Sequence, residues 1–355
     1  MELREIYKPI EGDLVEVKEE IRKQLAVEDD FMKRVVEDIV DSSGKLLRPA
    51  LALLAFSTGD NNRKSREEII KTASVIELVH TASLIHDDVI DETILRRHRM
   101  TLHARWGDKI SVLFGDYLFS RSFAMLCQLG HSEIVSALAN TISLICEGEL
   151  KQISRAYDWD LSEEDYLSII KKKTASLFSF SCLSGGHLGK LGADEIKALV
   201  NYGLNFGIAF QMIDDCLDFI GDEKATGKSL GSDLRRGKVT LPLIYLLRST
   251  PEEVRKEIVE SISPEQNDAI ILLIKQMLQE YQVMERCVKR ITQYMEKARE
   301  QAKKIDNAAV RKSFINICRY SLVNPLESCS ELNVRQETGP MKEKILTGGI
   351  KCSMG

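Results

Sequence analysis

Residues 84–91 read LIHDDVID and place Asp87, Asp88 and Asp91 at the end of a largely apolar segment. Residues 67–92 are apolar through most of their length and predict one long helix. On that helix Asp87 and Asp91 share one face, with a rise of ~6 Å between them, and Asp88 is turned ~100° away. Carboxylates packed this closely raise one another's pKa, so the pattern calls for cations nearby.

The same spacing recurs in residues 211–218, which read QMIDDCLD and contain Asp214, Asp215 and Asp218. One such motif fits a solvated helix face about as well as a metal site. Two copies, each within apolar sequence, favour carboxylates facing each other in a bundle core. Magnesium takes carboxylates together with substrate phosphates, so the pair of motifs predicts a Mg²⁺ cluster that binds a diphosphate.

The proline distribution predicts an all-α fold. Only 7 prolines occur in 355 residues, and none lies between Pro49 and Pro242. This suits helices with short connections and excludes a β-sandwich, which has turns every ~8–12 residues. We expect one all-α domain over residues 1–320 and a poorly ordered tail over 321–355. The other helical segments are expected at about 12–41, 46–56, 108–129, 132–155, 163–188, 193–219, 239–247, 252–260 and 265–304.

Charge and cysteine content limit the compartment and the partners. The formal net charge is −5, which argues against a nucleic-acid binder. None of the 8 cysteines has zinc-site spacing, and free thiols fit a reducing cytoplasm. No apolar run approaches the ~20 residues that span a bilayer, so we expect a cytoplasmic protein.

Basic residues accompany both acidic motifs. A single Lys or Arg is more often a solvated surface charge, but their grouping beside the aspartates favours phosphate binding. They are Arg96 and Arg97 after the first motif, Lys228, Arg235, Arg236 and Lys238 after the second, and Lys45 and Arg48 upstream of both.

Further ordered motifs surround the aspartates: Gly44-Lys45-x-x-Arg48-Pro49, Trp106-Gly107, Gly115-Asp116, Lys173-Thr174, Gly207-x-x-Phe210-Gln211, Gly227-Lys228, Asp233-Leu234, and Gly237-Lys238-x-Thr240-Leu241-Pro242. With these pieces, the chain resembles the trans-prenyltransferases, the polyprenyl diphosphate synthase family, from about Gly44 to Leu247. The resemblance implies an isoprenoid-synthase helical bundle, usually a homodimer, with a central cavity between two aspartate-rich helices. It also implies Mg²⁺-dependent, head-to-tail addition of isopentenyl diphosphate to an allylic diphosphate.

The resemblance also implies roles for individual residues. Lys173 and Thr174 would join the aspartates as catalytic residues, with Thr174 lining the reaction centre. Without the resemblance, His80 would be interpreted as a satisfied core histidine, and His86 as part of a local hydrogen-bond network. Three Mg²⁺ would be held by Asp87, Asp88, Asp91, Asp214, Asp215 and Asp218; the allylic diphosphate by Arg96, Lys173, Gln211, Lys228 and Lys238; and isopentenyl diphosphate by Lys45, Arg48, His80 and Arg97.

Small residues before the first motif favour a long product. Ala82 and Ser83 lie one turn before Asp87, where an aromatic side chain would stop chain growth early. Val79 and Leu78 lie deeper on the same helix. Together the four residues form the expected chain-length wall, the side of the cavity along which the product grows, and each further helical turn deepens the cavity by ~5.4 Å. The expected product is therefore C30–C50. The alternative interpretation is that the small residues only permit close helix packing.

The chain departs from the family pattern at three places. His98 follows Arg96-Arg97 where Gly is common, Asp108 replaces the usual Asn, and residues 307–355 lack the usual closing helix pattern. His98 is therefore expected to change the path of the chain after the helix and the direction of the Arg97 side chain.

Three other functions remain open. A geranylgeranyl (C20) diphosphate synthase would share every catalytic residue, whereas a terpene cyclase usually carries a different second motif. A non-catalytic subunit would normally have lost one acidic motif, although such a subunit remains an open choice as a heteromeric partner. A long apolar product would transfer to a membrane.

Overall fold

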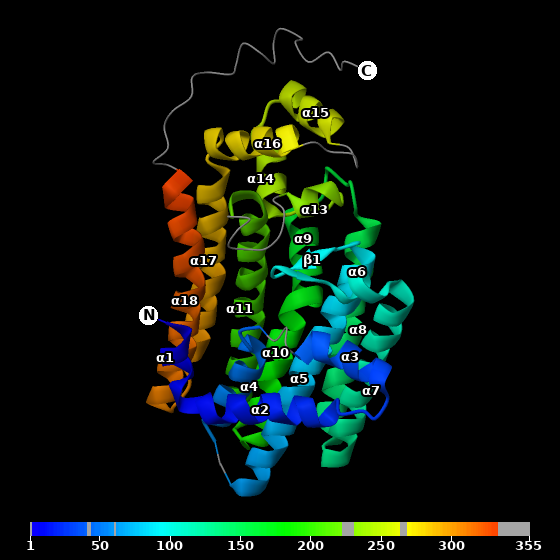
Figure 1. Cartoon of the computed structure of the whole chain (residues 1–355). Helices are drawn as coiled ribbons and strands as arrows, with labels where there is room; N and C mark the ends of the chain where they lie inside the picture. Colours follow the sequence, from blue (N-terminus) through cyan, green and yellow to red (C-terminus); the bar gives the residue numbers. More distant parts are fainter. Residues whose placement is uncertain (1, 41–43, 60–61, 222–230, 263–267, 333–355) are drawn as a thin grey trace.

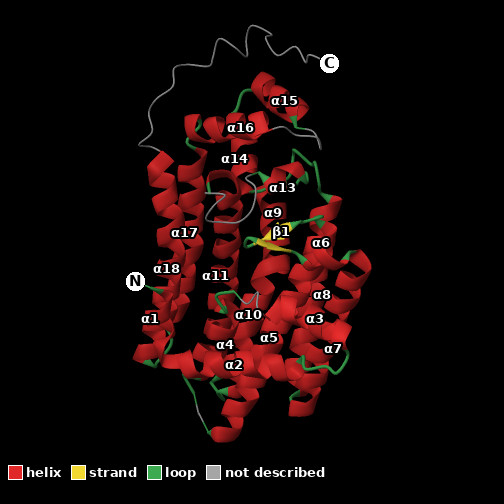
Figure 2. Ribbon diagram, viewed as in Figure 1, coloured by secondary structure: helices red, strands yellow, loops and turns green. Residues whose placement is uncertain are grey.

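The computed structural model describes residues 2–40, 44–59, 62–221, 231–262 and 268–332. Almost all of these residues lie in helices, which confirms the all-α prediction (Figure 2). The helices are α1 (Leu3–Tyr7), α2 (Glu11–Gln24), α3 (Asp30–Val40), α4 (Leu47–Phe56), α5 (Arg63–Ile90), α6 (Leu102–Trp106), α7 (Asp108–Leu129), α8 (Ser132–Ser154), α9 (Glu163–Ile170), α10 (Ser176–Leu188), α11 (Ala193–Ile220), α13 (Ser232–Arg235), α14 (Leu241–Ser249), α15 (Glu252–Ser261), α16 (Asp268–Glu280), α17 (Val283–Ala302) and α18 (Ala308–Leu332).

The long helices form a bundle (Figure 1). Helices α17 and α18 lie along one side and α7 and α8 along the other, with α5, α10 and α11 between them. Helix α2 crosses one end of the bundle, and α15 and α16 cover the other. The core is built from apolar side chains on these facing helices, including Tyr202, Phe178 and Phe206, which are fully buried.

Helix α5 carries the first acidic motif at its C-terminal end. It begins after Asn62, whose side chain accepts a hydrogen bond from the Ser65 amide. It ends in a Schellman turn: the Thr93 amide bonds the Asp88 carbonyl at 2.9 Å, and Glu92 adopts φ 48°. The turn ends the helix directly after the motif and places Asp91 at its C-cap.

A π-helical turn separates α9 from α10. It spans Lys171–Ala175 and therefore contains Lys173 and Thr174. Glycines on the neighbouring helices admit this wider turn. A Cβ atom on Gly148 of α8 would lie 2.6 Å from the backbone nitrogen of Lys173. A Cβ atom on Gly207 of α11 would lie 2.6 Å from the Cα atom of Ala175. Since π turns are uncommon and recur at functional sites, this segment marks the site before its side chains are considered.

A short hairpin that the sequence analysis did not expect follows α5. Strands β1 (Leu95–Arg96) and β2 (Arg99–Met100) pair antiparallel, with Arg96 opposite Arg99. The two turn residues, Arg97 and His98, have φ values of 52° and 63°, as a type I′ turn requires.

Other boundaries differ from the expectations in places where the backbone turns. The segment expected over 12–41 is two helices, α2 and α3, and the one expected over 265–304 divides at Gln282, which has φ 51°. The domain boundary expected at residue 320 falls inside α18, which continues to Leu332, and residues 333–355 lie outside the described part of the chain.

Helix α7 is long and apolar enough to cross a membrane, contrary to the sequence expectation. An 18-residue window of it has a mean hydropathy of 1.3, and 39% of that window is buried. The helix packs along α5, and the His86 Nε2 atom lies 3.1 Å from the Val112 carbonyl oxygen. These contacts make α7 a bundle helix.

We predict that Gly148→Ala destabilises the fold, because the new methyl group would collide with the backbone of the π turn. The expected loss in the free energy of unfolding is ~1–3 kcal/mol. The control is Gly12→Ala in α2, where a Cβ meets nothing within 4 Å. Alanine there should stabilise the helix by ~0.5–1 kcal/mol. Urea unfolding measures both values, and an unchanged midpoint for Gly148→Ala contradicts the prediction.

Candidate active site

The three aspartates of the first motif differ in their surroundings. Asp88 is buried, and Asp87 and Asp91 are half-buried. The Asp88 carboxylate accepts hydrogen bonds from Arg96 Nη2 at 2.8 Å and Nε at 2.9 Å. Burial lowers the pKa of Arg96, but the Asp88 carboxylate raises it by more, so the net shift of its pKa is upward. Asp88 therefore anchors the hairpin to α5, whereas Asp87 and Asp91, one helical turn apart, share a neighbouring face of the helix.

Asp91 is held by the segment that follows the second motif. Lys238 Nζ lies 2.6 Å from Asp91 Oδ2, and Arg236 Nε donates to the Asp91 backbone carbonyl at 2.8 Å. Arg236 Nη2 also bonds Thr93 Oγ1 at 3.0 Å. Burial raises the pKa of Asp91 but Lys238 and Arg236 lower it, with a net decrease. A guanidinium at the last carbonyls of α5 also complements the helix dipole.

Lys173 reaches Asp87 from the π turn. Its Nζ lies 3.6 Å from Asp87 Oδ2, donates to Gln152 Oε1 at 2.9 Å, and forms an ion pair with Glu149. Burial lowers the pKa of Lys173, but Asp87 and Glu149 raise it above its ordinary value, so the ammonium is charged. Burial also raises the pKa of Glu149, and Lys173 opposes that increase.

The second motif is stabilised by neutral donors at its central aspartate. Asp215 is buried and accepts hydrogen bonds from Tyr166 OH at 2.6 Å and Gln211 Nε2 at 2.7 Å. Thr174 Oγ1 in turn donates to Gln211 Oε1 at 2.7 Å. Burial and Asp233 raise the pKa of Asp215, whereas the two donors lower it, and the net shift is upward. Asp214, the neighbouring carboxylate, is exposed.

Asp218 joins the second motif to the segment that holds the first. Its side chain accepts hydrogen bonds from Ser232 Oγ at 2.7 Å and from the Asp233 amide at 3.1 Å. The Asp233 carbonyl bonds the Lys238 amide, and Lys238 bonds Asp91. Residues 231–238 therefore connect the two aspartate helices, α11 and α5. Lys228, the remaining allylic-site candidate, lies outside the described residues.

The four residues expected to bind isopentenyl diphosphate include a directly bonded pair. Arg48 Nη1 lies 3.1 Å from His80 Nε2, and the Arg48 guanidinium stacks 4.2 Å from the centre of the Phe178 ring. Since arginine only donates, His80 Nε2 accepts and its proton lies on Nδ1. Burial and the nearby arginines hold the pKa of His80 well below its ordinary value, so the ring is neutral. Burial also lowers the pKa of Arg48 to about 10.

Arg97 lies near this pair, whereas Lys45 contacts other elements. The Arg97 guanidinium packs against Gly44, where a Cβ atom would lie 2.6 Å from Arg97 Nη2. His98 occupies the left-handed turn position beside Arg97, so the turn forms without glycine at that position. Lys45 Nζ lies 5.4 Å from the centre of the Tyr320 ring on α18.

The residues of the expected chain-length wall face inward to different extents. Leu78, Val79 and Ala82 are buried in the core, and Ser83 is half-buried, with its Oγ donating to the His80 carbonyl at 2.8 Å. His86 Nε2 lies within hydrogen-bond distance of α7, which agrees with a local structural role.

The donor atoms suit magnesium. Across the described ranges, no three His, Cys, Asp or Glu side chains converge on one point. Asp87 and Asp91 nevertheless present carboxylate oxygens one helical turn apart, and Asp214 is exposed on the other helix. Magnesium commonly takes one or two carboxylates and completes its shell with water and phosphate oxygens, so these residues fit it.

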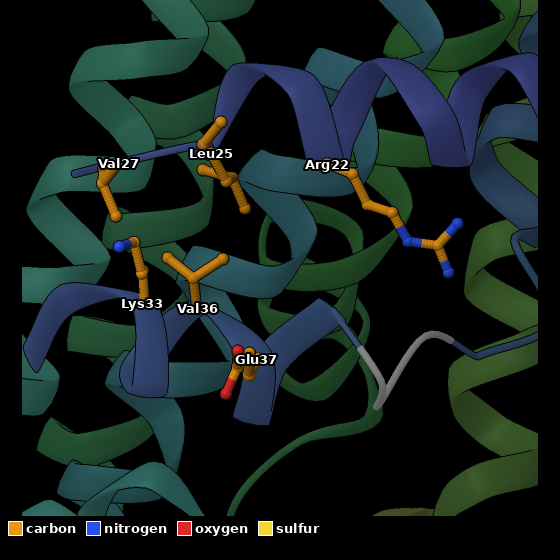
Figure 3. Close-up of a pocket in the computed structure, with 7 residues that line it drawn as sticks. Arg22, Leu25, Val27, Lys33, Val36 and Glu37 are labelled. Atoms are coloured by element: carbon orange, nitrogen blue, oxygen red, sulfur yellow. The ribbon is translucent and has the colours of Figure 1, made fainter. Parts of the chain in front are cut away.

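A separate cavity of about 310 Å³ lies between the end of α2 and α3 (Figure 3). It contains none of the expected site residues. Its lining residues are Arg22, Leu25, Ala26, Val27, Lys33, Val36 and Glu37.

The sequence analysis missed Glu149, Gln152 and Tyr166 as site residues. Polar residues at Glu149 and Gln152, spaced i and i+3 beside Gly148, were the available signal for a polar face on α8. Tyr166 offered no signal, because a tyrosine beside isoleucines in a helix is typical of a core.

Comparison with known proteins identifies close relatives. The chain matches the family model described as Polyprenyl synthetase over residues 29–301. The heptaprenyl diphosphate synthase component 2 of Geobacillus stearothermophilus is 35% identical over 298 residues, covering 84% of this chain and 91% of that protein. A decaprenyl diphosphate synthase structure from Rhodobacter capsulatus gives a TM-score of 0.83 at 31% identity, covering 90% and 98% of the two chains. A Caulobacter crescentus polyprenyl synthase structure, complexed with calcium and isoprenyl diphosphate, gives 0.85 at 30% identity and covers 90% and 97%.

We predict that Tyr166→Phe destabilises the protein by ~1–3 kcal/mol, because it leaves a buried Asp215 oxygen without a donor. Tyr245→Phe is the matched control. The Tyr245 hydroxyl donates to Glu163, which keeps its ion pair with Arg290 when that donor is removed. In urea unfolding, Tyr245→Phe should lower the free energy of unfolding by less than Tyr166→Phe does. Equal decreases in the two variants contradict the prediction.

Proposed function

Since the chain belongs to the polyprenyl synthetase family and is a prenyltransferase, we propose that it is a Mg²⁺-dependent trans-polyprenyl diphosphate synthase. It adds isopentenyl diphosphate units to an allylic diphosphate and makes a C30–C50 product. The observation that carries the proposal is the pair of aspartate motifs at the ends of α5 and α11, joined by one segment that holds both.

Asp87, Asp91 and Asp214 are the residues that would ligate magnesium, and Asp88, Asp215 and Asp218 fix the geometry through their partners. Three bound Mg²⁺ would stabilise negative charge on the departing diphosphate. Arg96, Lys173 and Lys238 would supply further positive charge at that group, together with Lys228. Gln211, fixed by Thr174 and Asp215, would orient it.

Isopentenyl diphosphate would bind at Arg48, Arg97 and Lys45. A neutral His80 supports this arrangement, because it orients the Arg48 guanidinium without neutralising its charge. Holding the isopentenyl double bond beside the allylic carbon converts a bimolecular step into an effectively unimolecular one.

We propose that the chain assembles with a second copy through α7 and α8. The two helices are consecutive neighbours, so the first half of α7 lies beside the last half of α8. These halves carry exposed apolar side chains, a pattern that indicates an interface. They are Val112, Leu113, Leu144, Leu150 and Ile153. The relative from Geobacillus stearothermophilus is described as a component, which supports a heteromeric partner as the alternative.

A cytoplasmic location is supported by the free cysteines of the described residues, of which Cys182, Cys216, Cys287 and Cys318 are buried. The long apolar product would pass from the enzyme to a membrane.

We predict that the purified chain elongates farnesyl diphosphate with radiolabelled isopentenyl diphosphate, and that EDTA abolishes the reaction. On a size-exclusion column, the activity should elute at the position expected for the mass of two chains. Activity that appears only after a second protein is added supports the heteromeric alternative. A C20 product identifies a geranylgeranyl diphosphate synthase, and no Mg²⁺-dependent elongation overturns the proposal.

We predict that Ala82→Tyr or Ser83→Phe shortens the product, because an aromatic ring one turn before Asp87 would block the path of the growing chain. Reversed-phase chromatography of the dephosphorylated product measures its length. Leu78→Phe, about one turn deeper than Ala82 on the same helix, should shorten the product less. An unchanged length in the Ala82 and Ser83 variants leaves only close helix packing as the role of these small residues.

A further inference from the structure

The two lysines beside the first motif hold its aspartates at different distances. Lys238 Nζ lies 2.6 Å from Asp91 Oδ2, a direct hydrogen bond, whereas Lys173 Nζ lies 3.6 Å from Asp87 Oδ2, beyond hydrogen-bond range. Both side chains are largely buried, with 12% of Lys238 and 19% of Lys173 exposed. Burial alone therefore does not explain the difference.

The difference comes from the acceptors that Lys173 finds on α8. Its ammonium pairs with Glu149 and donates to Gln152 Oε1 at 2.9 Å. An ammonium has three donors, so these two acceptors fix two of them and leave the third directed elsewhere. Glu149 and Gln152 are one helical turn apart, and Gly148 allows the π turn to approach this face of α8.

The proposed function makes this arrangement useful. An ammonium that closed onto Asp87 would occupy one of its carboxylate oxygens, as Lys238 does at Asp91, and would leave fewer oxygens of the motif to magnesium. An ammonium held back leaves that carboxylate available and presents its third donor to an incoming phosphate oxygen. A lysine side chain has four flexible bonds, so fixing it before the substrate binds removes an entropy cost from binding.

From these contacts we propose that Glu149 is a positioning residue, which holds the Lys173 ammonium off Asp87 and aims it at the allylic diphosphate. The proposal rests on the proposed function. It assigns Glu149 no contact with the reacting atoms, and it distinguishes Glu149 from a purely structural buried carboxylate by its effect on one substrate only.

The test measures steady-state kinetics of Glu149→Gln with each substrate varied in turn. We expect kcat/KM for farnesyl diphosphate to fall about 10- to 100-fold, as for other residues that orient a ligand group. The KM for isopentenyl diphosphate should stay at the wild-type value. The matched control is Glu147→Gln, which breaks the exposed ion pair between Glu147 and Lys172 at 2.7 Å, two residues before Glu149 on α8 and one before Lys173 in the π turn. It should behave as wild type.

A double-mutant cycle then separates positioning from structure. If Glu149 acts through Lys173, adding Glu149→Gln to Lys173→Gln causes no further loss. The inference is overturned if Glu149→Gln lowers kcat/KM for farnesyl diphosphate equally in the wild-type and Lys173→Gln backgrounds. It is also overturned if Glu149→Gln weakens the binding of both substrates, or if its kinetics equal those of the wild type. If Glu149→Gln fails to fold, Gln152→Leu removes the other acceptor and undergoes the same cycle. A wild-type chain that does not elongate farnesyl diphosphate overturns the proposed function itself, before any variant is compared.

Discussion

The constraint on which the site depends is the repulsion among three carboxylates at the end of an apolar helix. Each carboxylate has its own cation, and each cation comes from a different part of the chain. Arg96 comes from the hairpin directly after α5, Lys173 from the π turn, and Lys238 from the segment after α13. Because like charges in a partly buried site cannot all remain ionised without partners, the first motif draws these three segments together.

The second motif meets the same problem with neutral donors. Asp215 is bonded to a phenol and an amide, and Asp218 to a hydroxyl and a backbone amide. Hydrogen bonds from neutral groups stabilise a carboxylate without cancelling its charge. Burial and Asp233 outweigh these two donors at Asp215 and raise its pKa to about 7, whereas the cations around the first motif lower the pKa of Asp91. The two motifs therefore hold their buried carboxylates by different means, Asp88 with a guanidinium and Asp215 with neutral donors.

The sequence was sufficient to predict the long helices and the face on which each aspartate lies, because both follow from periodicity and the apolar content of α5 and α11. It could not predict which lysine holds which aspartate. The Lys173 contact depends on a π turn, and that turn depends on Gly148 and Gly207 on two other helices. Spacing along one helix carries no information on such contacts. The two-residue turn at Arg97 and His98 was missed for a similar reason, since neither residue is the Gly, Asn or Asp that usually marks a type I′ turn.

Arg48 extends the electrostatic argument to the second substrate. Its guanidinium stacks on Phe178 and bonds a neutral histidine, and within the described structure its buried Nε has no hydrogen-bond partner. Burial lowers its pKa to about 10, because this environment solvates the charge poorly. A cation that its surroundings compensate incompletely is costly for stability. The same incomplete compensation leaves the charge available to an anion, so the site gives up stability in the free enzyme and gains attraction for a diphosphate.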